Sequence, residues 1–86
     1  MDEKRYREKE RIKEFLASQP LPKAVRALRT ALGETQEQFA QRMGTVVRTI
    51  ARWESVRPPK GEVLRRLAVS AKEIKRIDLA SEFERA

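Results

Sequence analysis

Apolar and polar residues are arranged with helical periodicity in the middle of the chain. Phe39, Ala40 and Met43 lie three and four positions apart, so a helix over this stretch would bury all three on one face. Thr35, with Gln38 three residues later, matches the capping box, in which each side chain accepts a hydrogen bond from an unpaired backbone N–H. Thr35 is therefore the predicted N-cap of a short amphipathic helix.

A second short helix is predicted directly after the first. Gly44 interrupts the apolar pattern where the chain leaves the first helix, and glycine adopts the positive φ needed there without strain. Thr45 can cap the next helix. One side of that helix is apolar and is expected to pack on the body of the protein, through Val46, Ile50 and Trp53. The opposite side is expected to face outward and carries Arg48, Ala51, Arg52 and Ser55.

Together these features resemble the helix-turn-helix of phage-repressor-like (Cro/CI, or XRE-type) DNA-binding domains. The positions that carry the resemblance are Gln36, Phe39, Ala40, Gly44, Thr45, Ile50, Trp53 and Glu54. The match extends from Ala24 to about Ala68, and its specificity comes from many positions that agree in one register. The resemblance implies an all-α fold, a compact lambda-repressor-like bundle of five or six short helices around a central helix-turn-helix.

The chain departs from the family pattern just after the second helix. The family usually has a glycine there, whereas this chain has Val56 followed by Arg57, Pro58 and Pro59. A β-branched residue at positive φ would be strained, so the helix is expected to continue to about Val56. It should then stop because Pro58 disfavours helical geometry at Arg57. The loop after the helix is therefore expected to differ from that of the family.

Helices are also predicted on both sides of the motif. The first, from about Pro22 to Leu32, has Gly33 just past its end. The second, over residues 62–69, is apolar through Val63, Leu64, Leu67 and Ala68. Ser70 and Glu73 match a further capping box, which would start a last helix.

The two ends of the chain complete the predicted organisation. Residues 2–16 favour an extra N-terminal helix with a narrow apolar stripe, formed by Ile12, Phe15 and Leu16. Such a helix must dock on the body, which we favour, pair with a second copy or remain partly frayed. Residues 18–22 read as a linker because prolines disfavour helix before them. The expected division is an N-terminal helical extension with linker (1–20), a helix-turn-helix domain (21–69) and a C-terminal helix (70–86). The last helix suits simple packing and a dimer contact equally.

Composition limits the classes of function. The 86 residues make one small domain with a modest core. The absence of Cys and His excludes disulfides, thiol and imidazole chemistry and the usual zinc sites, so no metal or cofactor is expected. No nucleophile stands beside a base, so an enzyme acting on a small-molecule substrate is not expected. The chain has no stretch of membrane-spanning length and no secretory signal, so no membrane partner is expected. These features favour a cytoplasmic protein. The family resemblance implies that it is bacterial or phage-encoded and joins the nucleoid when it binds DNA.

The positive charge is concentrated in the middle of the chain. The net charge is +7, and residues 21–66 hold ten Lys or Arg against four Glu, a balance of +6. Such a concentration is typical of a phosphate-binding surface, although a merely solvated surface has the same composition. Arg26 and Arg29 lie off the buried stripe of their helix and are interpreted as solvated charges. Arg42 suits a surface ion pair as well as a phosphate contact.

The resemblance also implies which residues meet DNA. If the second helix enters the major groove, base contacts come from Val46, Val47, Arg48 and Arg52. The phosphate contacts expected from the family are Gln36, Thr45, Thr49, Arg57 and Lys60. Gln36 could instead only support the start of its helix, and Val46, which leans toward Ile50, could be a core residue. By its spacing Trp53 belongs to the core, and Glu54, which would repel phosphate, should pair within the domain.

The sequence thus favours a sequence-specific double-stranded DNA-binding protein. It would act as a transcriptional regulator, most simply a repressor that occupies an operator as a homodimer on two related half-sites. An alternative of another class is a DNA-binding antitoxin of a toxin–antitoxin pair, which also neutralises a toxin protein partner. In that case the partner would bind the segment before Pro20 or the last helix.

Overall fold

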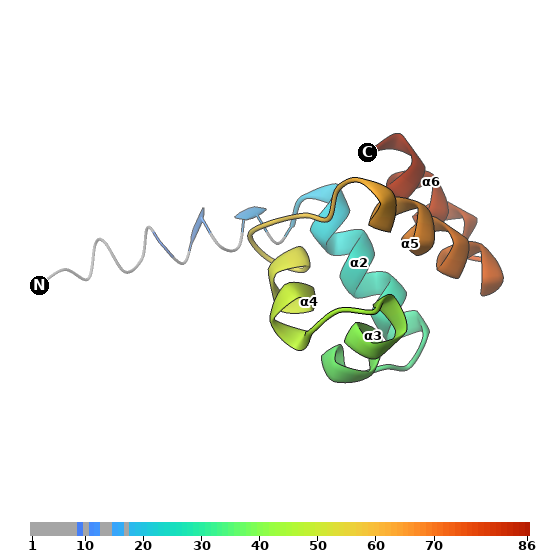
Figure 1. Ribbon diagram of the computed structural model, residues 1–86. Helices are drawn as coiled ribbons and strands as arrows, with labels where there is room; N and C mark the ends of the chain where they lie inside the picture. Colours follow the sequence, from blue (N-terminus) through green and yellow to red (C-terminus); the bar gives the residue numbers. More distant parts are fainter. Residues whose placement is uncertain (1–8, 10, 13–14, 17) are drawn as a thin grey trace, which may run out of the picture.

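The computed structural model describes residues 9, 11, 12, 15, 16 and 18–86, and its ordered elements are helices. These are α2 (Pro20–Ala31), α3 (Gln36–Met43), α4 (Val47–Trp53), α5 (Glu62–Glu73) and α6 (Ile77–Arg85). Figure 1 shows α2 crossing the middle of the molecule, with α3 and α4 on one side of it and α5 and α6 on the other. The expected all-α fold is confirmed, since no strand occurs in the described part of the chain.

The core lies where these five helices meet. Each helix contributes at least one side chain that is almost completely buried, and the largest are Val25, Leu28, Phe39, Ile50, Leu67 and Phe83. Burying an aliphatic or aromatic side chain of this size contributes about 1.5–3 kcal/mol to the free energy of unfolding. The predicted apolar faces of the two motif helices are therefore the faces that hold the motif on the body.

Helix α2 begins earlier than predicted. Gln19 is its N-cap, and Pro20 and Pro22 both lie in its first turn. The first N–H groups of a helix have no partner within the helix, so prolines there sacrifice no hydrogen bond. The prediction that residues 18–22 form a linker is therefore wrong from Pro20 onward. Gly33 lies just past the end of the helix, as predicted, and has a positive φ of 71°.

The start and end of α3 confirm the predicted signals. The Thr35 hydroxyl accepts a hydrogen bond from the backbone N–H of Gln38 at 3.1 Å. The Gln38 side chain in turn accepts one from the backbone N–H of Thr35 at 2.9 Å. Gly44 ends the helix in the left-handed region, with a φ of 69°. The N–H of Thr45 then reaches back to the carbonyl of Ala40 at 2.9 Å, so the turn satisfies a carbonyl at the end of α3.

Replacing Gly44 by alanine should lower the free energy of unfolding by about 1 kcal/mol, because an L-residue is strained at this φ. The nearest atom to an added Cβ is Arg66 Nη1 at 3.8 Å, so backbone strain and not a clash determines the cost. Urea unfolding followed by circular dichroism measures the change. Gly33→Ala is the matched variant that measures backbone strain alone. Gly33 has nearly the same φ, 71°, and nothing lies within 4 Å of its added Cβ. A Gly44→Ala variant as stable as the wild type would show that the turn does not need a left-handed residue.

Helix α4 differs from its prediction at both ends. Val46 is the N-cap, and its carbonyl accepts from the N–H of Thr49 at 3.0 Å. Thr45 lies one residue too early to cap the helix, so that prediction is wrong. At the other end the helix stops at Trp53 and does not continue to Val56.

A tight turn ends α4 at Trp53, so Pro58 does not determine where the helix stops. The N–H groups of Ser55 and Arg57 both donate to the carbonyl of Arg52, at 3.1 and 2.9 Å. These bonds satisfy a carbonyl at the helix end without a residue at positive φ. The turn after Glu54 thus replaces the glycine that the family usually has at this place.

The last two helices also depart from their predicted boundaries. Helix α5 continues to Glu73, with Ser70 buried inside it, so the predicted capping box at Ser70 does not exist. The helix crosses the expected boundary between residues 69 and 70 without a break. The turn to α6 falls at Lys75, which has a φ of 61°, and α6 has no side-chain cap. Helix α6 packs along α5 and buries Leu79, Ala80 and Phe83.

Most of the predicted N-terminal helix, residues 2–16, lies outside the described residues. Of its apolar stripe, Ile12 and Phe15 are 58% and 63% exposed, so neither side chain is docked on the body as we expected. Among the described residues, no helix is both long enough and apolar enough to cross a membrane.

Candidate DNA-binding surface

One side of helix α4 is exposed to solvent, and the other packs on the core. Ile50 is completely buried, whereas Arg48 and Arg52 are exposed. Val46 is 62% exposed and Val47 is also exposed, so the alternative that Val46 is a core residue is wrong. The four predicted base-contacting residues therefore all reach the surface, from the N-terminal end of the helix and its next turn.

The two arginines of this surface are free to donate hydrogen bonds. Arg48 and Arg52 lie four residues apart, which places them on the same side of the helix. Within the described part of the chain, neither forms an ion pair or a side-chain hydrogen bond. Each guanidinium keeps all five N–H donors available to a ligand.

A buried carboxylate fixes the C-terminal end of α4. Glu54 is only 7% exposed, and its two oxygens accept from Arg29 Nε at 2.6 Å and Arg29 Nη2 at 3.2 Å. Arg29 Nη1 also donates to the backbone carbonyl of Glu34 at 3.0 Å. The hydrogen bond to Glu54 raises the pKa of Arg29 above its already high ordinary value. The prediction for Glu54 is confirmed, whereas the interpretation of Arg29 as a solvated charge is wrong.

Gln36 joins the same network from the start of α3. Its Nε2 donates to Glu54 Oε1 at 3.2 Å, so Gln36 supports the local structure, as one of the two expected alternatives requires. The side chain remains half-buried, with a second amide N–H outside this bond. Gln36 is also the first residue of its helix, where the backbone N–H has no partner within the helix. The geometry therefore allows Gln36 to hydrogen-bond Glu54 and to contact a phosphate at the same time.

Three of the other predicted phosphate contacts converge beside α4. A hollow of about 530 Å³ lies between the helix and the following loop, lined by Thr49, Arg52, Trp53, Val56, Arg57, Pro58, Pro59, Lys60 and Val63. Arg57 and Lys60 are exposed on its rim, and Thr49 is half-buried. Thr45 is also half-buried but lies outside this hollow, in the turn before α4. Trp53 forms part of the wall and packs partly on the core, as its spacing predicted.

Arg42 lies outside this surface and forms an ion pair. Its Nη2 and Nε donate to the Glu34 carboxylate, with distances of 2.7–3.0 Å. The hydrogen bond to Glu34 raises the pKa of Arg42. An exposed pair of this kind contributes little to stability.

Comparison with known proteins places the motif in a family. A family model described as helix-turn-helix matches residues 25–69, just over half of the chain. A search of curated proteins and a search of solved structures found no match. The matched residues run from within α2 to within α5, so they contain α3, α4 and every residue of the Glu54 network. The chain belongs to the Cro/CI-type (XRE) helix-turn-helix family, whose members are DNA-binding regulators, and its partner is DNA.

Proposed function

We propose that the protein represses transcription by binding a specific operator with α4 in the major groove. The observation that carries this proposal is the pair of exposed, unpaired arginines, Arg48 and Arg52, on a helix whose other side is buried. A guanidinium can bond guanine O6 and N7 together, which is worth roughly 1–3 kcal/mol of discrimination per good pair. Val47 would press on a thymine methyl group, and Val46 would contact the adjacent edge of the groove.

The remaining contacts would position the helix without reading bases. The set consists of Gln36, Thr45, Thr49, Arg57 and Lys60. The N-terminal end of α3 supplies unpaired backbone N–H groups and the positive end of the helix dipole beside Gln36. Arg57 and Lys60 add two cations on the rim of the hollow next to α4. Contacts of this kind set the orientation of the protein on the duplex.

The operator is expected to hold two half-sites because the proposed regulator is a homodimer. A two-fold symmetric dimer would place its two α4 helices in successive major grooves, about 34–36 Å apart. Titration of duplexes with a fluorescent label tests this. A duplex with two half-sites one helical turn apart should bind with higher affinity than one whose half-sites are offset by half a turn. Equal affinity for both spacings, or for one half-site alone, would contradict the dimer.

A second candidate is the antitoxin. In the structure Leu79, Ala80 and Phe83 of α6 are buried in the chain's own core, so they are not free to bind a partner. The exposed Ile12 and Phe15 leave the N-terminal segment as the candidate toxin-binding part. Co-expression with the product of an adjacent gene tests this. A stable complex that Ile12→Asp with Phe15→Asp abolishes would support the antitoxin, whereas a protein that purifies alone would contradict it.

A further inference from the structure

We propose that the outward side of α5 is a docking surface for an acidic, amphipathic segment of another protein. The surface, here called the α5 surface, consists of Arg65, Arg66 and Val69 with the two hollows beside them. It shares no residue with the proposed DNA contacts, but Arg66 reaches the turn beside Thr45, with Nη1 3.8 Å from the position of a Cβ added at Gly44, so the test below includes DNA as an outcome. The proposal does not depend on which bases the protein reads.

Two unpaired arginines and an exposed valine form the centre of the α5 surface. Val69 follows Arg65 by four residues and Arg66 by three, so the three side chains are neighbours on the helix. Val69 is 52% exposed, so its side chain is available to a ligand. Within the described residues, neither arginine forms an ion pair or a side-chain hydrogen bond. The centre therefore offers ten N–H donors, five on each guanidinium, around an apolar side chain.

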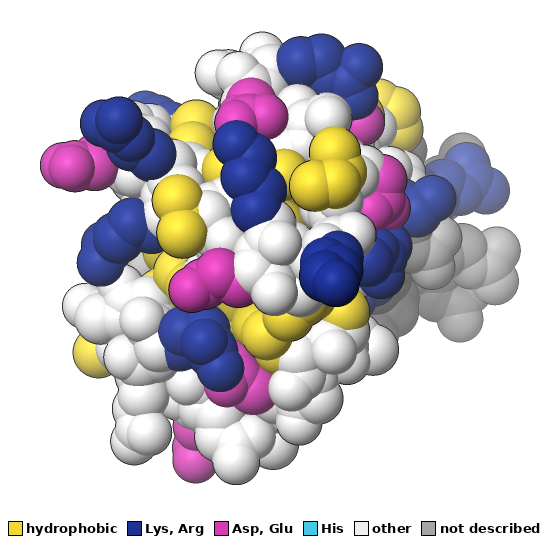
Figure 2. Space-filling model, turned by 90° about the vertical axis from the view of Figure 1, so that its right-hand side faces the viewer, with side chains coloured by type: hydrophobic (Ala, Val, Ile, Leu, Met, Phe, Trp, Pro, Cys, Tyr) yellow, Lys and Arg dark blue, Asp and Glu magenta, His cyan; other side chains and the backbone are white. Residues whose placement is uncertain are grey.

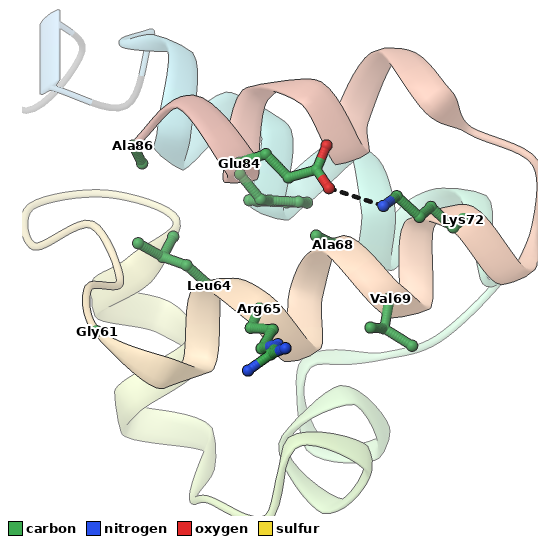
Figure 3. Close-up of a pocket in the computed structure, with 9 residues that line it drawn as sticks. Gly61, Leu64, Arg65, Ala68, Val69, Lys72, Glu84 and Ala86 are labelled. Atoms are coloured by element: carbon green, nitrogen blue, oxygen red, sulfur yellow. Dashed lines mark hydrogen bonds and ion pairs between the residues drawn. The ribbon is translucent and has the colours of Figure 1, made fainter.

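Two hollows lie on either side of this centre, and Arg65 and Val69 border both. The first, about 450 Å³, lies between α5 and α6, and its apolar wall is formed by Leu64, Ala68 and Phe83. The second, about 320 Å³, lies between α5 and the end of α3, with Met43 and Arg66 in its wall. Figure 3 shows Arg65 and Val69 leaving α5 on the side away from the Lys72–Glu84 ion pair, which bridges to α6.

The charge around the hollows shows what kind of partner fits. Lys72 is paired with Glu84 at 2.7 Å, and Arg42 is paired with Glu34 at 2.7 Å, so the charges within each pair cancel. Of the charged side chains that line the two hollows, Arg65 and Arg66 have no partner among the described residues, and the carboxylates of a binding partner would complement them. The face in Figure 2 shows Lys and Arg side chains interspersed with hydrophobic side chains and with Asp and Glu.

Neither DNA nor a second copy of the chain fits this surface as well. A phosphate backbone would meet the arginines but has no apolar groups to fill the hollows or cover Val69. In a two-fold symmetric dimer a patch meets the same patch of the other subunit, so a dimer centred on Arg65 and Arg66 would bring unpaired arginines together. Like charges at an interface oppose association. An amphipathic helix fits, because its aliphatic side chains can enter the hollows and its carboxylates can meet the arginines.

Selection from a displayed library of random peptides, about 15 residues long, tests the proposal on the full-length chain. Wild-type protein should enrich peptides with several Asp or Glu and with Leu, Ile, Val or Phe at helical spacing. Arg65→Glu with Arg66→Glu should weaken the binding of such a peptide by about tenfold or more, because attraction becomes repulsion. Val69→Ser should weaken it several-fold. The matched control is Lys9→Glu with Arg11→Glu, which makes the same charge change at two exposed residues and should leave peptide affinity within about twofold.

Several results would overturn the proposal. They are a failure to enrich peptides, enrichment of peptides without acidic residues, and an equal loss of peptide affinity in the control. Sedimentation that shows a wild-type dimer and a monomeric Arg65→Glu, Arg66→Glu variant would assign the surface to a second copy. A larger loss of duplex DNA affinity in that variant than in the control would assign it to DNA. Circular dichroism should show all variants equally folded, since the substituted arginines are exposed and glutamate favours helix.

Discussion

Replacing Glu54 by alanine is expected to lower the free energy of unfolding by about 3 kcal/mol. Removing one partner of a buried ion pair costs roughly 3–5 kcal/mol because the other charge remains without compensation. The Arg29 side chain is 20% exposed, so water can reach the orphaned guanidinium and the lower end of that range applies. For a chain of this size the midpoint of thermal unfolding should fall by on the order of 15 °C. Differential scanning calorimetry measures both quantities.

The matched control for Glu54 is Glu84→Ala. Glu84 pairs with Lys72 at the surface, and both side chains are about half exposed, so its loss should cost less than about 1 kcal/mol. Arg29→Met combined with Glu54→Leu should be more stable than the sum of the two single changes predicts, since neither charge is then left alone. Equal destabilisation by Glu54→Ala and Glu84→Ala would show that the buried network does not hold the motif together.

Replacing Arg48 and Arg52 by alanine should abolish the preference for the operator over other duplexes. Each good bidentate contact is worth roughly 1–3 kcal/mol, so the pair should cost about 30-fold to 10⁴-fold in affinity for each half-site of the preferred sequence. Affinity for unrelated DNA should fall much less, because phosphate contacts supply most of that binding. Fluorescence anisotropy with a preferred duplex and a shuffled duplex, at the same salt concentration, measures the two losses.

Gln36→Ala provides the contrast to the arginine variant. A phosphate contact carries no sequence information, so its loss should weaken binding to both duplexes by a similar factor. The change also removes the hydrogen bond to Glu54, which should cost about 1 kcal/mol of stability, so affinities are compared where every variant is folded. Equal loss on both duplexes for the arginine variant would contradict the assignment of Arg48 and Arg52 to bases.

Features set by neighbouring residues were predictable from the sequence. The capping box of Thr35 and Gln38 and the left-handed Gly44 depend on residues within one turn of each other. The burial of Ile50 follows from apolar spacing within one helix. The family resemblance added the register of the whole motif, and the family match over residues 25–69 confirms the family.

Features set by contacts between distant segments could not be predicted from local patterns. Arg29 and Glu54 are 25 residues apart, and no periodicity links them, although the buried pair fixes the end of α4. Ser70 has the residue type of an N-cap, but α5 continues through it to Glu73, and Ser70 is buried inside the helix, where it borders the same hollow as Met43 of α3. Val46 fits the apolar spacing of α4 but is exposed. It is the N-cap and has an extended backbone, so helical periodicity does not determine the direction of its side chain.

Selection from a random duplex library at near-physiological salt tests the central claim most directly, with the wild type and the Arg48→Ala, Arg52→Ala variant run side by side. The claim is that an exposed face of α4 reads DNA sequence while the rest of the domain holds it in place. We expect the wild type to enrich an inverted repeat and the variant to enrich none, while the variant still binds DNA weakly. No enrichment by the wild type, or the same repeat from both proteins, would contradict the claim and assign the exposed face of α4 to another partner.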